Sequence, residues 1–232
     1  MSAIASTIRI AWLGDIVGKA GRAAAVHAAT VLRAGPNPPH LIVVNAENAR
    51  HGRGLHPEGL AELQAGGIDL ITLGDHAFDD TRIVPALLAA DVPVIAPINM
   101  DAPEGVVSGG EVKRRWVATV DAGAGPVTVV FLLVVGRIFM RAEFPDPFAA
   151  LDAAMESISR DHPGALVLME VHAEATSEKQ ALAWHARQNW GGDGPADEAD
   201  ATRARVVGVV GSHTHVQTND ARLLDGRIAA LT

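Results

Sequence analysis

The sequence predicts an α/β fold organised around a largely parallel β-sheet. Short apolar runs alternate with helix-like segments along the first part of the chain, and this alternation is typical of βαβ units. Of the 232 residues, 48% are hydrophobic and only 4% are aromatic, so aliphatic side chains must fill a sizeable core. We expect a single domain that spans residues 1–232.

The elements of the first half follow from the local pattern. Apolar runs predict strands at residues 8–13, 41–45, 70–73 and 94–96. Helices are predicted between these strands at residues 22–33, 57–65 and 81–90. Farther along, two apolar runs at 112–120 and 127–135 flank a Gly-rich turn, which predicts an antiparallel hairpin.

The second half begins with a clear helix start. Asp146 followed by Pro147 is typical of an N-cap with proline in the first turn, and the helix should extend to about Arg160. Apolar runs predict further strands at residues 165–171, 205–210 and 227–232. The segment 187–202 is rich in Gly, Asp, Ala and Glu, which predicts a mobile surface loop.

Composition excludes several classes of function. The formal net charge is −8 and no basic run is longer than Lys113-Arg114-Arg115, which argues against duplex nucleic acid as a partner. The absence of cysteine excludes disulfides, thiolate metal sites and a cysteine nucleophile. Residues 1–7 lack the features of a signal peptide, and no apolar run approaches the roughly 20 residues that span a bilayer. We expect a cytoplasmic protein with no membrane association.

Polar side chains follow the carboxyl ends of five predicted strands. They are Gly14-Asp15, Glu47-Asn48, Gly74-Asp75-His76, His172 and His213-Thr214-His215. Ligands bind at that edge in open α/β sheets, so we expect these side chains to converge at one sheet edge. Taken singly, Asp15 or Asp75 could be a helix cap and His172 a core histidine. His213 and His215 are the most specific pair, because i and i+2 side chains of an extended segment share a face.

Together these residues form a mixed oxygen and nitrogen ligand set without thiolates. Such a set suits Mn, Fe or Zn better than Ca, and it is too large for one tetrahedral zinc. A bridging carboxylate with ligands on both sides describes a dinuclear site, whose ions lie about 3.5–4 Å apart and act on a phosphoryl group. Competing motifs fail, because Gly18-Lys19 is followed by Ala20 and so lacks the P-loop hydroxyl.

Six segments resemble the YmdB-like phosphodiesterases of the calcineurin-like metallophosphoesterase superfamily. They are WLGDIVGKAGR (12–22), VNAENARHGRG (44–54), ITLGDHAFD (71–79), VGRIFM (135–140), VHAEATSEK (171–179) and VVGSHTHVQTND (209–220). The resemblance implies a four-layer α-β-β-α metallophosphoesterase fold with mixed sheets. It also implies phosphodiesterase activity on cyclic nucleotides, both 2′,3′-cyclic and 3′,5′-cyclic AMP.

The resemblance also implies a role for each site residue. Two metal ions would be held by Asp15 and His215 on one side, Asp75, His172 and His213 on the other, Glu47 between them and Asn48 beside the pair. A metal-bridging hydroxide would attack phosphorus, Asn48 would also contact the substrate, and His76 would donate a proton to the leaving oxygen. Iron is the metal that the resemblance implies, with manganese or zinc as alternatives.

Three features depart from the resemblance. The family usually has Asn where this chain has Asp75, and the additional carboxylate should tighten metal retention and slow turnover. The segment 187–202 is longer than the corresponding family connection, and a lid, an oligomer contact and a surface insertion remain open for it. Family members generally continue beyond the point where this chain ends, and a further strand or loop there would cover one side of the site.

Two other functions remain open. A phosphomonoesterase acting on nucleotides would use the same metal pair, and a metal-binding regulatory protein with weak or no hydrolysis would keep the same ligands. Hydrolysis of a diester separates the first alternative, and metal retention without hydrolysis would favour the second. We expect a small phosphodiester or nucleotide as substrate and a homo-oligomeric assembly.

Overall fold

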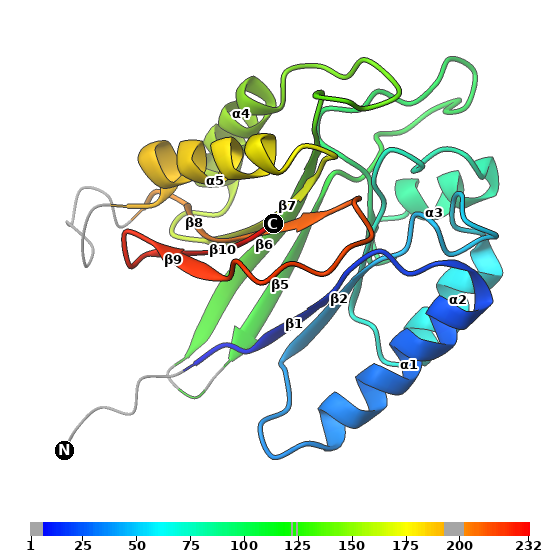
Figure 1. Cartoon of the computed structure of the whole chain (residues 1–232), viewed down its shortest axis with the longest axis horizontal. Coiled ribbons are helices and arrows are strands. Elements are labelled where there is room, and N and C mark those ends of the chain that lie inside the picture. Colours follow the sequence, from blue (N-terminus) through cyan, green and yellow to red (C-terminus); the bar gives the residue numbers. More distant parts are fainter. Residues whose placement is uncertain (1–6, 122, 124, 193–201) are drawn as a thin grey trace.

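Two β-sheets lie face to face in the computed structural model, which describes residues 7–121, 123, 125–192 and 202–232 (Figure 1). Within these residues, one sheet is parallel and is formed in order by β1 (Ile10–Leu13), β2 (Leu41–Asn45), β3 (Leu70–Thr72) and β4 (Val94–Ile95). The other sheet is mixed, in the order β5-β6-β7-β8-β10-β9. Its strands are β5 (Arg115–Asp121), β6 (Pro126–Val135), β7 (Leu166–His172), β8 (Arg205–Ser212), β9 (Arg222–Leu224) and β10 (Ile228–Leu231).

Helices cover the outer face of each sheet (Figure 1). The four-stranded sheet packs against α1 (Gly18–Ala34), α2 (Pro57–Ala65), the short 3₁₀ turn η1 (Thr81–Ile83) and α3 (Val84–Leu88). The six-stranded sheet packs against α4 (Pro147–Asp161) and α5 (Thr176–Trp190). The resulting order of layers is α-β-β-α, which confirms the metallophosphoesterase fold that the resemblance implies.

One apolar cluster packs between each sheet and its helices, and a third fills the space between the two sheets. On β2, Leu41 and Val43 face this cluster, whereas Ile42 and Val44 face the helices. Both faces of the strand are therefore buried, which explains why the strand is a continuous apolar run. Phe131 of β6 is fully buried at the centre of this cluster, and its side chain helps to hold the sheets together.

Several local predictions are confirmed. The helix predicted at 57–65 begins and ends at those residues. The side chain of Asp146 accepts hydrogen bonds from the backbone N–H groups of Phe148 and Ala149, and Pro147 is the first residue of α4. The predicted hairpin is also present, because β5 and β6 pair in antiparallel orientation.

Other expectations need correction. The polar clusters do not share one sheet edge, because β1, β2 and β3 belong to one sheet and β7 and β8 to the other. The loop predicted at 187–202 starts too early, since Arg187 lies in the last turn of α5. Its residues 193–201 lie outside the described residues, as do residues 1–6. Both α5 and β9 were missed.

In the part of the chain that the structure describes, no helix has the length and apolar character needed to cross a bilayer.

Candidate active site

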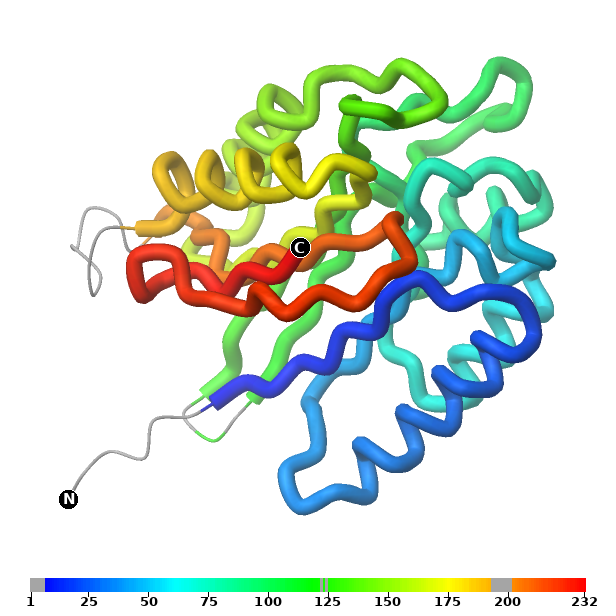
Figure 2. Tube along the Cα trace, in the orientation of Figure 1, coloured from blue at the N-terminus to red at the C-terminus, as the bar shows by residue number. Residues whose placement is uncertain are grey.

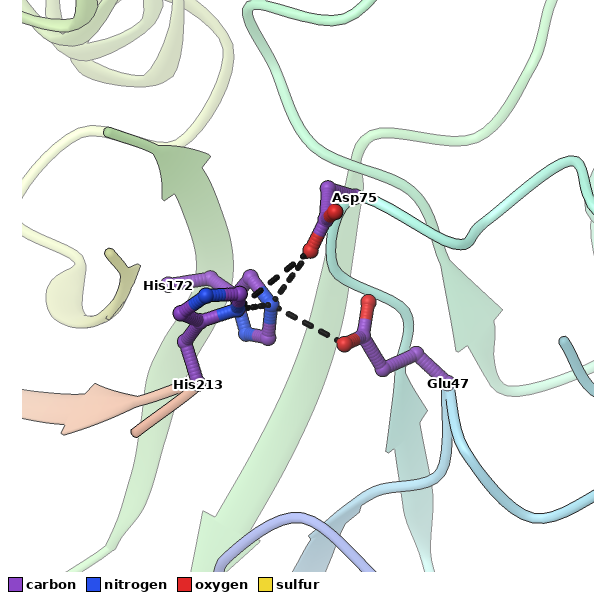
Figure 3. A group of neighbouring side chains, drawn as sticks. All are labelled: Glu47, Asp75, His172 and His213. Atoms are coloured by element: carbon purple, nitrogen blue, oxygen red, sulfur yellow. Dashed lines mark hydrogen bonds and ion pairs between the residues drawn. The ribbon is translucent and has the colours of Figure 1, made fainter. Parts of the chain in front are cut away.

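Four of the predicted ligands meet between the carboxyl ends of strands from both sheets (Figure 3). Glu47 and Asp75 follow β2 and β3, whereas His172 ends β7 and His213 follows β8. The Nε2 atom of His172 lies 3.0 Å from Glu47 Oε1 and 3.0 Å from Asp75 Oδ1. His213 turns its Nδ1 toward the same point, 3.1 Å from His172 Nε2 and 3.4 Å from Asp75 Oδ1.

The remaining predicted residues extend this cluster on its other side. Asp15, which follows β1, places Oδ2 at 3.2 Å from His215 Nε2. The same oxygen accepts a hydrogen bond from the backbone N–H of His213 at 2.9 Å. Asn48 links the Asp15–His215 pair to the first four ligands, because its Nδ2 lies 3.1 Å from Glu47 Oε1 and 3.2 Å from His215 Nε2. The structure thus brings all of the predicted ligands into one cluster.

Two observations fit this cluster to metal cations. The first is the donor set, in which carboxylate oxygens and imidazole nitrogens point at a common position, as Mn, Fe or Zn require. The second is Oδ1 of Asp15, which is buried and has no hydrogen-bond partner. A buried carboxylate oxygen left without a partner is costly, and a bound cation would satisfy it.

Without a bound cation, burial and neighbouring charges shift the pKa values of three side chains in the cluster. Burial raises the pKa of Asp15, and the charge of His172 offsets this only in part. Burial opposes the ionisation of Asp75, but hydrogen bonds with His172 and His213 outweigh it and hold the pKa of Asp75 far below its usual value. Burial alone would lower the pKa of His172, yet the charge of Glu47 and the bond to Asp75 raise it well above normal. A protonated His172 therefore supplies positive charge among the carboxylates.

His76 lies at the edge of the cluster. Its backbone N–H donates to Glu47 Oε2 at 2.9 Å, and its ring Nδ1 lies 2.9 Å from Asp79 Oδ2. Asp79 is not among the residues predicted for the site, although it lies three positions after His76 in the same resembling segment. An aspartate bound to Nδ1 orients the ring so that Nε2 is the nitrogen available to a substrate.

The backbone around the site takes conformations that depend on particular residues. A Cβ atom on Gly74 would lie 2.4 Å from His172 Nε2 and 2.5 Å from Glu47 Oε2, so only glycine permits this close approach. His213 and His215 both have positive φ angles, of 88° and 52°. Such conformations are uncommon for residues with side chains and cluster at functional sites.

A groove opens beside the cluster and is lined by residues 12–17, 211–217 and Thr232, with further residues of α1. Figure 2 shows why these segments meet, because the N-terminal strand runs alongside the C-terminal part of the chain. Asp15 and His215 both line the groove, so the groove adjoins the cluster.

Three further residues that contact the ligand histidines were not predicted from the sequence. Glu174 Oε2 lies 3.3 Å from His213 Nε2, while Glu170 and Ser212 lie behind His172. A signal for Glu170 was present, because a residue two positions before His172 on a strand lies on the same face.

Comparison with known proteins finds similar sequences and structures that include a named phosphodiesterase and a named phosphatase. The 2′,3′-cyclic-nucleotide 2′-phosphodiesterase of Bacillus subtilis (strain 168) is 34% identical over 97% of this chain and 74% of its own length. A crystal structure of a hypothetical protein from Thermus thermophilus matches with a TM-score of 0.74 and 32% identity, covering 96% of this chain and 74% of that chain. A phosphatase structure from Mycoplasma pneumoniae has the same fold, with a TM-score of 0.74 at 24% identity over 96% of this chain and 70% of its own.

The fold and these relatives define a phosphoric ester hydrolase with the metallophosphoesterase fold. The profile of the family described as YmdB-like protein matches residues 11–194. The chain therefore belongs to the YmdB-like family.

Proposed function

We propose that this protein hydrolyses the phosphodiester bond of cyclic nucleotides at a site that holds two metal ions. The observation that carries the proposal is the single cluster of oxygen and nitrogen donors that the two sheets form together. The name of the Bacillus subtilis relative supports 2′,3′-cyclic nucleotides as the substrate class, and 3′,5′-cyclic AMP is a further candidate.

The positions of the ligands support two ions more than one. The first ion would be held by Asp15 and His215, and the second by Asp75, His172 and His213, with Glu47 between them and Asn48 beside both. Two such ions would supply Lewis-acid charge and a water molecule of lowered pKa. Iron, manganese and zinc all suit these donors.

The charge of the site also supports metal dependence. Three carboxylates, those of Asp15, Glu47 and Asp75, surround the position where a phosphodiester would bind. These groups would repel an anionic substrate, and the chain as a whole carries a formal charge of −8. Bound cations would reverse the local sign and make phosphate binding favourable.

His76 would donate the proton that the leaving oxygen needs. Asp79 holds Nδ1 of the ring at 2.9 Å, so Nε2 would face the leaving group as a general acid. Asn48 would contact the phosphate through its amide, since its side chain lies between Glu47 and His215.

The test combines elemental analysis with an assay of 2′,3′-cyclic AMP hydrolysis on the same purified sample. We expect about two metal ions per chain. We expect His76→Ala to lower turnover by about 10²–10⁴-fold with metal content unchanged. His185→Ala is a matched control, because its ring also lies 2.9 Å from an aspartate, Asp152, but in the outer helical layer.

Three results would contradict the proposal. Two bound metals without hydrolysis of diesters or monoesters would favour a metal-binding regulatory protein, and hydrolysis of monoesters alone would favour a phosphomonoesterase. Substantially fewer than two metals after reloading with manganese or iron would mean that the ligand assignment is wrong.

A further inference from the structure

A buried carboxylate, Glu170, lies directly behind the candidate site. It is on β7, two residues before His172, and it is fully buried. Its Oε1 accepts hydrogen bonds from Asn45 Nδ2 and Ser212 Oγ, each at 2.6 Å. Its Oε2 accepts a hydrogen bond from Thr72 Oγ1, also at 2.6 Å. Glu170 and its three partners are not among the residues that the proposed function uses.

The partners of Glu170 lie on the strands that carry the ligands. Asn45 is the last residue of β2, Thr72 of β3 and Ser212 of β8. Glu170 therefore connects the four strands that deliver the four side chains drawn in Figure 3. One carboxylate thus bonds to both sheets at the level of the site.

The hydrogen bonds also determine which nitrogen of His172 carries a hydrogen. Ser212 Oγ lies 2.6 Å from Glu170 Oε1 and 2.9 Å from His172 Nδ1. A serine hydroxyl has one hydrogen to donate, and the carboxylate oxygen is the stronger acceptor. Ser212 can then only accept from His172, so the hydrogen of that bond lies on Nδ1.

A proton on Oε2 of Glu170 would not change this pattern. It would be donated to Thr72, and the bonds of Oε1 to Asn45 and Ser212 would stay as they are. In both cases Nδ1 of His172 carries a hydrogen. The lone pair of the neutral ring is then on Nε2, the nitrogen that faces Glu47 and Asp75.

We propose that Glu170 and Ser212 are positioning residues that keep the hydrogen of His172 on Nδ1 and present Nε2 to the metal site. Ligating histidines generally bond through the second nitrogen to a carboxylate or another acceptor, which fixes the ring and its tautomer. In this protein the carboxylate acts through a serine. Metal binding through Nε2 rests on the function proposed above, whereas the position of the hydrogen on Nδ1 does not.

The experiment measures the Nδ1–H signal of His172 by NMR in protein labelled with ¹⁵N-histidine. The signal is assigned with His172→Asn and recorded without metal and after loading with zinc. We expect a signal protected from solvent exchange in both states of the wild type. Ser212→Ala should lose this protection and lower zinc affinity by about 10–100-fold, and Ser212→Thr should restore both.

Thr72→Val is the matched control, because Thr72 bonds to Glu170 at the same 2.6 Å but does not bond to His172. It should keep the protected signal and the wild-type zinc affinity. Equal losses in Ser212→Ala and Thr72→Val would overturn the proposal, as would a wild type without a protected hydrogen on Nδ1 or zinc binding through Nδ1. If the wild type binds no zinc, the dinuclear site is wrong, and the metal-free spectrum still decides where the hydrogen lies.

Discussion

The four-stranded sheet supplies the carboxylates of the proposed ligand set, whereas the six-stranded sheet supplies its imidazoles. Asp15, Glu47 and Asp75 follow β1, β2 and β3, and the three ligand histidines end or follow β7 and β8. The carboxylates of Glu47 and Asp75 on one sheet pair with His172 on the other. The site therefore exists only where the two sheets pack together.

The two halves also differ in how deeply they are buried. The side chains of Asp15 and Glu47 are 2% and 1% exposed. The histidines form a gradient, from 0% for His172 through 24% for His213 to 45% for His215. Asp15, Glu47 and His172 thus form the floor of the site, and His213 and His215 form its solvent side.

The largest effect should separate the buried histidine from the exposed one. His172→Ala leaves Glu47 buried without its imidazole partner and leaves Asp75 with His213 alone, which should cost about 3–5 kcal/mol of unfolding free energy in the metal-free protein. His215→Ala, at the exposed end, should cost less than about 1 kcal/mol. Urea denaturation of chelator-treated protein measures both, and equal losses would show that the cross-sheet pairing does not hold the sheets together.

The next effect concerns how closely the acidic sheet approaches the imidazoles. A Cβ on Gly74 would overlap His172 and Glu47, whereas a Cβ on Gly14 would meet nothing within 4 Å. Both glycines precede an aspartate of the site. Gly74→Ala should lower metal affinity by at least about tenfold, and Gly14→Ala should leave it unchanged. Metal competition with a chelator tests this difference, and similar affinities in the two variants would rule out the steric explanation.

The opposite charges of the two halves predict a pH dependence for the metal-free protein. The pKa of His172 is raised by Glu47 and Asp75 despite burial, so its contribution to stability is full below about pH 6.5 and is lost as the pH rises toward the folded value. Burial raises the pKa of Asp15 and Glu170, which also makes stability fall with rising pH. The lowered pKa of Asp75 acts in the other direction, and its contribution is lost below about pH 4.

The chelator-treated wild type should therefore be less stable at pH 9 than at pH 6. Each unit by which the pKa of His172 is raised corresponds to about 1.4 kcal/mol. His172→Gln should reduce the difference between the two pH values in urea denaturation. A wild type that is equally stable at both values would contradict the assignment of positive charge to His172.

The smallest expected effect is that of neutralising one acid of the site, Asp75. Asp75→Asn removes one negative charge next to His172 and His213. Metal retention should weaken by less than about tenfold, and turnover should rise because the metal pair becomes a stronger Lewis acid. Unchanged metal content and unchanged rate would refute this role for Asp75.

Local signals in the sequence were sufficient for most elements but not for their assembly. Pro57 and the Asp146-Pro147 pair mark helix starts that need no information from elsewhere in the chain. The division into two sheets is a different problem, since β2 is apolar on both faces and its residues do not indicate which layer each face contacts. Helix α5 was missed because it buries the charged residues Glu178 and Lys179, which interrupt its apolar pattern.

The site residues could be predicted because polar side chains stood out after apolar strands. Their orientations could not, since the choice between Nδ1 and Nε2 depends on bonds such as that of His172 to Ser212. Glu170 lies inside an apolar run, and its partners Asn45 and Thr72 come from the other sheet. Only tertiary structure brings these three side chains together.

The aromatic packing between the sheets has an optical consequence. Trp12 and Trp116 lie 5.8 Å and 5.6 Å from the ring of Phe131, whereas Trp184 and Trp190, the other two of the four tryptophans, are on α5. Fluorescence from this protein therefore originates in two regions, the space between the sheets and helix α5. Any event that separates the sheets should change the emission of Trp12 and Trp116 through their contacts with Phe131, so the chain carries its own reporter for the interface on which the site depends.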